Sequence, residues 1–267
     1  MPRRLQRAYH QELFLAAKRN LIALLLVCTC GGSPRAAPDI TIMALPTVAQ
    51  TAPIAVTPPP PRRIDLLDVR DSRHGPRAAS LVATELQNLE NLLAVTPMNS
   101  PDRPQLLRRL AEDYVEQRKS TGAGGDKAID RYSTLTQQYP SYPLLDEVLY
   151  FVAMEYEAAQ KLMDARKTYY ELIKQHPSSR YIPAAYFAFG EMFVQEGKVD
   201  PSKWEFARQA YTEVIKFPND ALRPWALWRL GQVLDQQGDH GSAQAMYAQL
   251  RRGYQDSEAI EHIGETP

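Results

Sequence analysis

Residues 145–177 read LDEVLYFVAMEYEAAQKLMDARKTYYELIKQHP, and this stretch decides the fold. Its first half carries large and small apolar residues at helical spacing, namely Leu149, Val152, Ala153 and Tyr156. Its second half repeats the pattern after a short polar break, with Ala165, Tyr169 and Leu172. Apolar residues three and four positions apart lie on one face of an α-helix, and Pro177 cannot continue a helix. The stretch therefore predicts two helices that pack against each other, with Ala165 and Tyr169 buried between them.

The same pattern occurs four times in the chain. The first helices share one spacing: Leu107/Leu110/Ala111/Tyr114, Leu149/Val152/Ala153/Tyr156, Tyr186/Phe189/Gly190/Phe193 and Leu227/Leu230/Gly231/Leu234. The second helices all place Tyr four residues after Ala: Ala128/Tyr132, Ala165/Tyr169, Ala207/Tyr211 and Ala243/Tyr247. Small residues allow helices to approach closely, and large ones fill the remaining space. The repeats are expected at about residues 104–140, 145–177, 182–218 and 222–255.

Two further helices flank the repeats. One is expected in residues 78–100, where Val82, Leu86, Leu89 and Leu93 share a face and Thr96-Pro97 ends the run. A short one is expected after the fourth repeat. The glycine-rich residues 122–125 precede Lys127-Ala128 rather than Lys-Ser or Lys-Thr, so they indicate a lengthened turn and not a phosphate loop. The sequence predicts an all-α protein of about four helix pairs in residues 101–263.

These repeats resemble the tetratricopeptide repeat (TPR) family, which implies a superhelix of helix pairs. Residues 169–190, YYELIKQHPSSRYIPAAYFAFG, look like the bacterial envelope branch of that family. Its members serve in outer-membrane β-barrel assembly (BamD-like) or beside the Tol–Pal system. Residues 101–116, PDRPQLLRRLAEDYVE, are similar to TPR proteins of gliding-motility and envelope machines. The resemblance implies a scaffold that binds protein partners.

The N-terminus is typical of an export signal. Lys18 and Arg19 precede an apolar run of ten residues, 21–30, and about 20 are needed to span a bilayer. Residues 1–30 are therefore expected to be a signal peptide of the lipoprotein type. The resemblance to lipoprotein signals implies lipidation at Cys30, with Cys28 as the alternative. Ordinary cleavage that discards both cysteines also remains open.

Residues 31–77 are expected to be a tether. Eight prolines lie between Ser33 and Pro61, and such a composition favours an extended, semi-rigid segment. A lipid anchor followed by a tether would hold the repeats at the periplasmic face of an outer membrane, although an inner membrane is the alternative. The lipid is the only membrane contact expected, because no second long apolar run occurs.

Charge and composition exclude several function classes. Residues 78–267 carry 20 Lys and Arg against 26 Asp and Glu, a net charge of −6, which disfavours nucleic acid as a partner. Only two cysteines occur, so a disulfide-stapled fold and a Cys-ligated zinc site are excluded. None of the five histidines lies in a metal-binding or nucleophile-activating pattern. We expect no catalytic residue, metal, cofactor or small-molecule substrate. The acidic pairs Glu112-Asp113 and Asp146-Glu147 are expected to be solvated.

The first helices carry the candidate binding residues. In TPR proteins these helices line a concave groove, and three of four residues at one equivalent position are aromatic: Arg108, Tyr150, Phe187 and Trp228. Trp225, Met154, Val194 and the acidic Glu191 lie nearby on the same faces. Such residues are enriched among interface anchors and would suit a peptide with apolar and basic side chains. The alternative is that these rings pack internally.

Three functional interpretations follow. The first is a non-enzymatic, lipid-anchored TPR scaffold that binds partners of an envelope machine for assembly, secretion or gliding motility. The second is a cytoplasmic TPR adaptor with a disordered N-terminal arm. The third is a cell-wall enzyme whose site has no recognisable motif.

Overall fold

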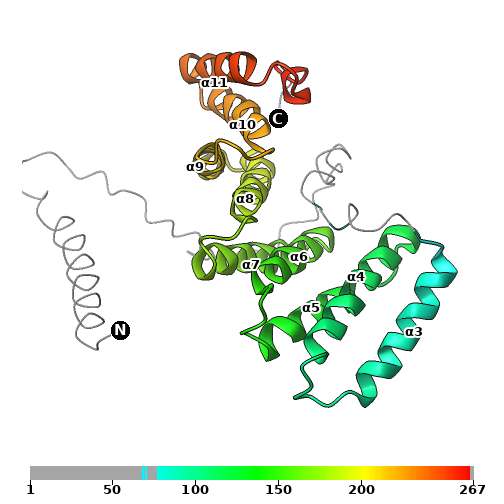
Figure 1. The fold of residues 1–267 in the computed structure, drawn as a ribbon. Coiled ribbons are helices and arrows are strands. Elements are labelled where there is room, and N and C mark those ends of the chain that lie inside the picture. The colour runs from blue at the N-terminus through cyan, green and yellow to red at the C-terminus, as the bar shows by residue number, and fades with distance from the viewer. Residues whose placement is uncertain (1–67, 69, 71–76, 265–267) are drawn as a thin grey trace, which may run out of the picture. The chain divides into compact units, whose positions relative to one another are not determined.

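The computed structural model describes residues 68, 70 and 77–264, and these described residues form helices and turns without a β-strand (Figure 1). The described α-helices are α3 (Ala79–Val95), α4 (Arg103–Thr121), α5 (Gly125–Gln138), α6 (Leu145–Ala158), α7 (Leu162–Gln175), α8 (Ile182–Gly197), α9 (Trp204–Ile215), α10 (Arg223–Gln236) and α11 (His240–Gly253). Two 3₁₀ turns, η1 (Pro201–Lys203) and η2 (Glu258–Ile260), complete the described elements. The predicted all-α fold is confirmed.

Successive helices pack as pairs, with α4 on α5, α6 on α7, α8 on α9 and α10 on α11 (Figure 1). Each pair also packs against the first helix of the next pair, and α3 packs on α4. Ala165 and Tyr169 are buried, as predicted. This arrangement makes each repeat depend on its neighbours for a complete core.

In the third and fourth repeats, the glycine of the first helix lies against the ring of the repeat tyrosine. A Cβ atom added at Gly190 would lie 2.4 Å from Cε1 of Tyr211, and one at Gly231 would lie 2.2 Å from Cε1 of Tyr247. Both distances are far below van der Waals contact, so α8 and α9, and likewise α10 and α11, could not approach this closely with a larger residue. In these two repeats the glycine of the pattern therefore makes room for the ring of the repeat tyrosine.

The helix ends follow the sequence signals. Helix α3 ends at Val95, directly before Thr96-Pro97, and α5, α7 and α9 end two or three residues before Pro140, Pro177 and Pro218. Of the glycine-rich residues 122–125, the first three form the turn between α4 and α5, and Gly125 begins α5. Gly122 has a φ of 78°, in the left-handed region that favours glycine. The turn interpretation of this segment is confirmed.

The two flanking elements are tied to the repeats differently. The Arg77 guanidinium, just before α3, donates to Asp113 of α4 at 2.7 Å and also binds Glu85 and Glu116. At the other end, the short helix expected after the repeats is the single 3₁₀ turn η2, whose Ala259 is buried against α10 and α11. In the described part of the chain, no helix is long and apolar enough to cross a membrane. The expected signal peptide, both cysteines and the tether, apart from three of its residues, lie outside the described residues.

Candidate partner-binding face

The predicted aromatic stripe lies inside the protein. The side chains of Tyr150, Phe187 and Trp228 are 1%, 2% and 0% exposed, and Trp225 and Val194 are also buried. The expectation that these rings form an open binding surface is therefore corrected, and the internal-packing alternative describes them. The physical reason is that neighbouring elements cover the slot three residues before each small residue.

The covering elements differ from repeat to repeat. The Tyr150 ring stacks on Tyr181 with ring centroids 4.8 Å apart, and Tyr181 comes from the turn that precedes α8. The Phe187 ring meets the edge of Tyr211 from the second helix of its own repeat, at 5.5 Å. Aromatic pairs at these separations are favourable beyond the area they bury. These rings thus join adjacent helices.

The C-terminal segment covers the tryptophans of α10. The imidazole of His262 lies 5.1 Å from the Trp228 ring and 5.5 Å from the Trp225 ring, centroid to centroid. The Trp228 indole N–H donates to the backbone carbonyl of His262 at 2.7 Å. A buried indole needs a hydrogen-bond acceptor, and this carbonyl supplies it. The chain therefore closes its own last repeat, and we name this set, Trp225, Trp228 and His262, the aromatic closure.

Acidic residues of the first helices bind the repeat tyrosines. The hydroxyls of Tyr169, Tyr211 and Tyr247 donate to Glu157, Glu191 and Asp235, at 3.1, 2.8 and 2.9 Å. The Glu191 carboxylate also binds the buried guanidinium of Arg229 through a bond of 2.6 Å to Nε. Glu191 was expected to face a partner, and the structure instead pairs it within the protein. Met154, the remaining residue of the predicted groove, is half-buried on α6.

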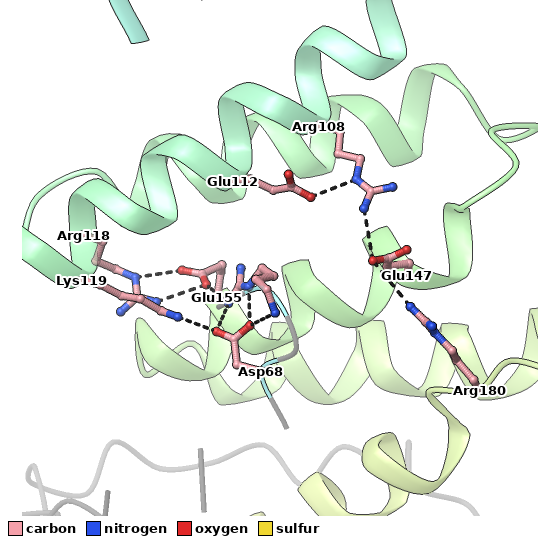
Figure 2. Close-up of polar contacts among 9 residues, drawn as sticks. Asp68, Arg108, Glu112, Arg118, Lys119, Glu147, Glu155 and Arg180 are labelled. Atoms are coloured by element: carbon pink, nitrogen blue, oxygen red, sulfur yellow. Dashed lines mark hydrogen bonds and ion pairs between the residues drawn. The ribbon is translucent and has the colours of Figure 1, made fainter. Parts of the chain in front are cut away.

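A second polar chain links α4, α6 and the turn before α8 (Figure 2). The Arg108 guanidinium donates to Glu112 at 3.0 Å and to Glu147 of α6 at 3.1 Å. Arg180 reaches the same Glu147 carboxylate at 4.0 Å, and its own side chain is exposed. Arg108 occupies the same repeat position as Trp228, yet Arg108 is held by ion pairs with carboxylates and Trp228 by aromatic rings. The predicted role of Arg108 in a groove is replaced by this inter-repeat bridge.

The most unusual contacts involve two residues from outside the repeats. Asp68 and Arg70 lie in non-helical backbone, and both are buried between the end of α4 and helix α6 (Figure 2 labels Asp68). Arg70 donates from Nη2 to Glu155 of α6 at 2.8 Å, and its guanidinium carbon lies 4.9 Å from the centroid of the Phe151 ring. Lys119 donates to Asp68 at 2.9 Å.

The repeats supply the rest of this site. Arg118 of α4 donates from Nε to the second oxygen of Glu155 at 2.9 Å. We name Arg118, Lys119, Phe151 and Glu155 the α4–α6 site, with Asp68 and Arg70 as its occupants. Burial alone raises the pKa of Asp68, but the hydrogen bonds and charges of Arg70 and Lys119 hold this pKa well below its usual range. The occupant carboxylate is therefore charged at neutral pH.

Sequence reasoning missed this site and misplaced its neighbours. The pairs Glu112-Asp113 and Asp146-Glu147 were expected to be solvated, but Asp113 is 0% exposed and Glu147 is 3% exposed. The expectation was wrong because adjacent helix positions point about 100° apart, so one residue of each pair faces inward. Each inward carboxylate is compensated by an arginine, Arg77 for Asp113 and Arg108 for Glu147.

The arrangement is suited to holding a peptide. Among the described residues, no group of three or more His, Cys, Asp or Glu side chains could hold a metal ion. On the first helices, Arg108 pairs with Glu147, and Glu191 pairs with Arg229. At the α4–α6 site similar bonds hold the side chains of Asp68 and Arg70, two residues outside the helices.

Comparison with known proteins supports the repeat assignment. Residues 153–179 and 225–257 match the tetratricopeptide repeat family. Two stretches of the chain are therefore similar to tetratricopeptide repeats. The matched ranges overlap the second and fourth repeats recognised from the spacing and run two residues past each, and the other two repeats share the same helix pairing. No curated protein sequence matches the chain significantly.

Solved TPR-like structures share this fold. Two crystal structures of MamA superpose with TM-scores of 0.51 and 0.52, each at 15% sequence identity. The first alignment covers 71% of this chain and 90% of MamA, and the second covers 69% and 94%. At this identity the likeness shows the fold alone.

Proposed function

We propose that this TPR protein is a non-enzymatic scaffold that binds a protein partner through the faces of its first helices. The observation that carries this proposal is the α4–α6 site, where the repeats already hold two side chains of irregular backbone. Repeat proteins present extended surfaces of this kind for binding. A charged and aromatic pocket that grips an extended segment supports recognition of peptides rather than catalysis.

We further propose that the scaffold works in the cell envelope, held by a lipid at Cys30 on the periplasmic face of the outer membrane. The basic and apolar start of the chain and its proline-rich residues 31–77 support this location. Labelling with a clickable fatty acid tests it. The wild-type chain should be labelled and a Cys28→Ala/Cys30→Ala chain should not, whereas persistent labelling of the double variant would rule out this anchor.

Site-specific photocrosslinking tests the scaffold role. A photoreactive amino acid at Ser120, at the exposed end of α4 beside Lys119, should crosslink one partner in living cells. The matched control is the same amino acid at Lys167, an exposed residue on the second helix α7. A partner captured equally from both positions, or from neither, would contradict binding at the first-helix face.

A further inference from the structure

We infer that the α4–α6 site recognises a partner segment with an acidic residue followed two positions later by arginine, and that Asp68 and Arg70 occupy it until such a partner displaces them. This inference rests on the proposed scaffold function and deepens it, because it names the chemistry of the peptide. The segment that displaces Asp68 and Arg70 is a partner peptide in which an acidic residue stands two positions before an arginine (acid–x–arginine).

The arginine half of the recognition is a pocket built by α6. Glu155, 1% exposed, accepts from Arg70 Nη2 at 2.8 Å, while the Phe151 ring lies 4.9 Å from the guanidinium carbon. A carboxylate and an aromatic face together suit a planar guanidinium, which forms directed bonds and stacks on rings. A lysine ammonium offers no planar fork. The pocket therefore selects arginine.

The acidic half fixes the spacing. Asp68 accepts from Arg70 Nε at 2.7 Å and from Nη2 at 2.8 Å, and the backbone N–H of Arg70 donates to it at 3.1 Å. This fork-to-fork pairing holds the guanidinium in the orientation that reaches Glu155. Lys119 then holds the carboxylate from α4 at 2.9 Å. An acidic residue two positions before arginine is thus the unit that bridges α4 and α6.

The present occupant leaves the site incompletely satisfied. Arg70 is 8% exposed, and its Nη1 atom is buried without a hydrogen-bond partner among the described residues. The hydroxyl of Tyr132 is also buried without a hydrogen-bond partner among the described residues. Unsatisfied buried donors weaken an association. A partner segment that brings an acceptor to these atoms would bind better than Asp68 and Arg70 do.

The site also tolerates loss of its occupant. When Arg70 leaves, Glu155 keeps the guanidinium of Arg118, which binds it at 2.9 and 3.2 Å. Its buried carboxylate is therefore not left alone, which would be strongly destabilising. Because Asp68 and Arg70 belong to the same chain, their local concentration at the site is high, and an external peptide must outcompete them. The contact is thus a built-in competitor.

Peptide binding to the full chain in detergent tests the inference. The probe is a fluorescent synthetic peptide of residues 64–74, IDLLDVRDSRH, followed by anisotropy. A chain with Arg70→Ala should bind this peptide at least tenfold more tightly than wild type, because the competitor is removed. Adding Glu155→Gln to that chain should weaken binding at least tenfold. Adding Glu196→Gln, which removes the same charge from the α8 residue paired with Arg166, should change nothing.

Peptide variants test the chemistry. Replacing the arginine by lysine, or the aspartate that precedes it by two positions by asparagine, should each weaken binding to the Arg70→Ala chain severalfold or more. Equal affinity of wild-type and Arg70→Ala chains, or indifference to both peptide changes, would overturn the inference. If Arg70→Ala lowers the melting temperature below the assay range, the same comparison is made with Arg70→Lys.

Two further results separate this inference from the proposed function. A wild-type chain that is dimeric and becomes monomeric with the peptide would show that a second copy fills the site, which overturns the partner assignment. Specific crosslinking from Ser120 together with failed peptide binding would leave the scaffold role intact and reject only the acid–x–arginine chemistry.

Discussion

The α4–α6 site lies between the first and second repeats and the aromatic closure lies on the last, and different interactions close the two regions. In the first region the chain before α3 supplies Asp68 and Arg70, which are held by ion pairs with Lys119 and Glu155. In the last region the chain after α11 supplies His262, whose ring packs at a tilt against Trp225 and Trp228. The same contrast is seen at one repeat position, where Arg108 forms ion pairs and Trp228 packs against other rings.

This difference indicates in which region the covering residues can be displaced by a partner. Removing His262 would expose two indole rings to water, and burial of apolar area contributes roughly 25 cal/mol per Å². Removing Asp68 and Arg70 exposes charged groups that water and Arg118 can satisfy in part. Ionic contacts also weaken with salt and change with pH, whereas ring packing does neither strongly. The first region is therefore suited to regulated binding and the last to stability.

The largest effect is expected from a substitution between the two regions. Ala165→Glu forces a charge and extra volume into the closed contact of α6 and α7, which should lower the free energy of unfolding by about 4 kcal/mol. Because repeats contact only their neighbours, both regions should lose structure together. Urea denaturation followed by circular dichroism measures this. The control is Lys167→Glu, exposed on the same helix, and an unchanged midpoint for Ala165→Glu would contradict the repeat assignment.

The next effect should come from the aromatic closure. Trp228→Ala removes a fully buried ring and the donor to His262, so we expect a loss of about 3 kcal/mol in unfolding free energy. Trp228→Phe keeps a ring and should lose less. Both losses should be insensitive to sodium chloride. A Trp228→Ala protein with wild-type stability and abolished partner binding would restore the open aromatic stripe that the structure argues against.

A smaller, pH-dependent effect is expected from the α4–α6 site. Since the pKa of folded Asp68 is held below its unfolded value of about 3.9, its ion pairs stabilise the fold above that value and are lost as pH falls toward the folded pKa. Asp68→Asn should therefore cost about 2 kcal/mol at pH 7. The gap from wild type should shrink below pH of about 4 and in high salt. A gap that stays constant with pH would show that shape, not charge, holds this contact.

The sequence predicted what is local and repeated. The spacing of Ala165 and Tyr169 recurs four times, so chance does not explain it, and the helix pairs follow from it. It did not predict His262 on Trp228, because that contact joins residues 34 positions apart without a periodic signal. The contact of Arg70 with Glu155 spans 85 positions, and no periodic signal in the sequence indicates it either. Arg108 four residues before Glu112 was a readable hint that charges on α4 are paired rather than solvated.

The last prediction uses an acid that lies between the two regions and has the opposite pH dependence. Burial, together with the charge of Glu191, raises the pKa of Glu157 to about 7, although the hydroxyl of Tyr169 donates to it at 3.1 Å. A folded pKa above the unfolded value of about 4.3 means that folding binds a proton between these values. Stability from this group therefore falls as pH rises from about 4.3 to about 7.

Glu157→Gln removes this cost and keeps an acceptor for Tyr169. Because one pKa unit corresponds to about 1.4 kcal/mol and the side chain is only half-buried, we expect a gain of about 1 kcal/mol at pH 8. The gain should vanish toward pH 5, where the wild-type carboxyl is protonated in the folded protein. Asp68→Asn run in parallel should show the reverse trend, with its cost largest at high pH. The two acids would then respond to pH with opposite signs, because cations surround Asp68 while an acid and a tyrosine hydroxyl surround Glu157. A Glu157→Gln protein less stable than wild type at pH 8 would mean that the charged form of Glu157 is stabilised in the fold, and the contrast between the two acids would be lost.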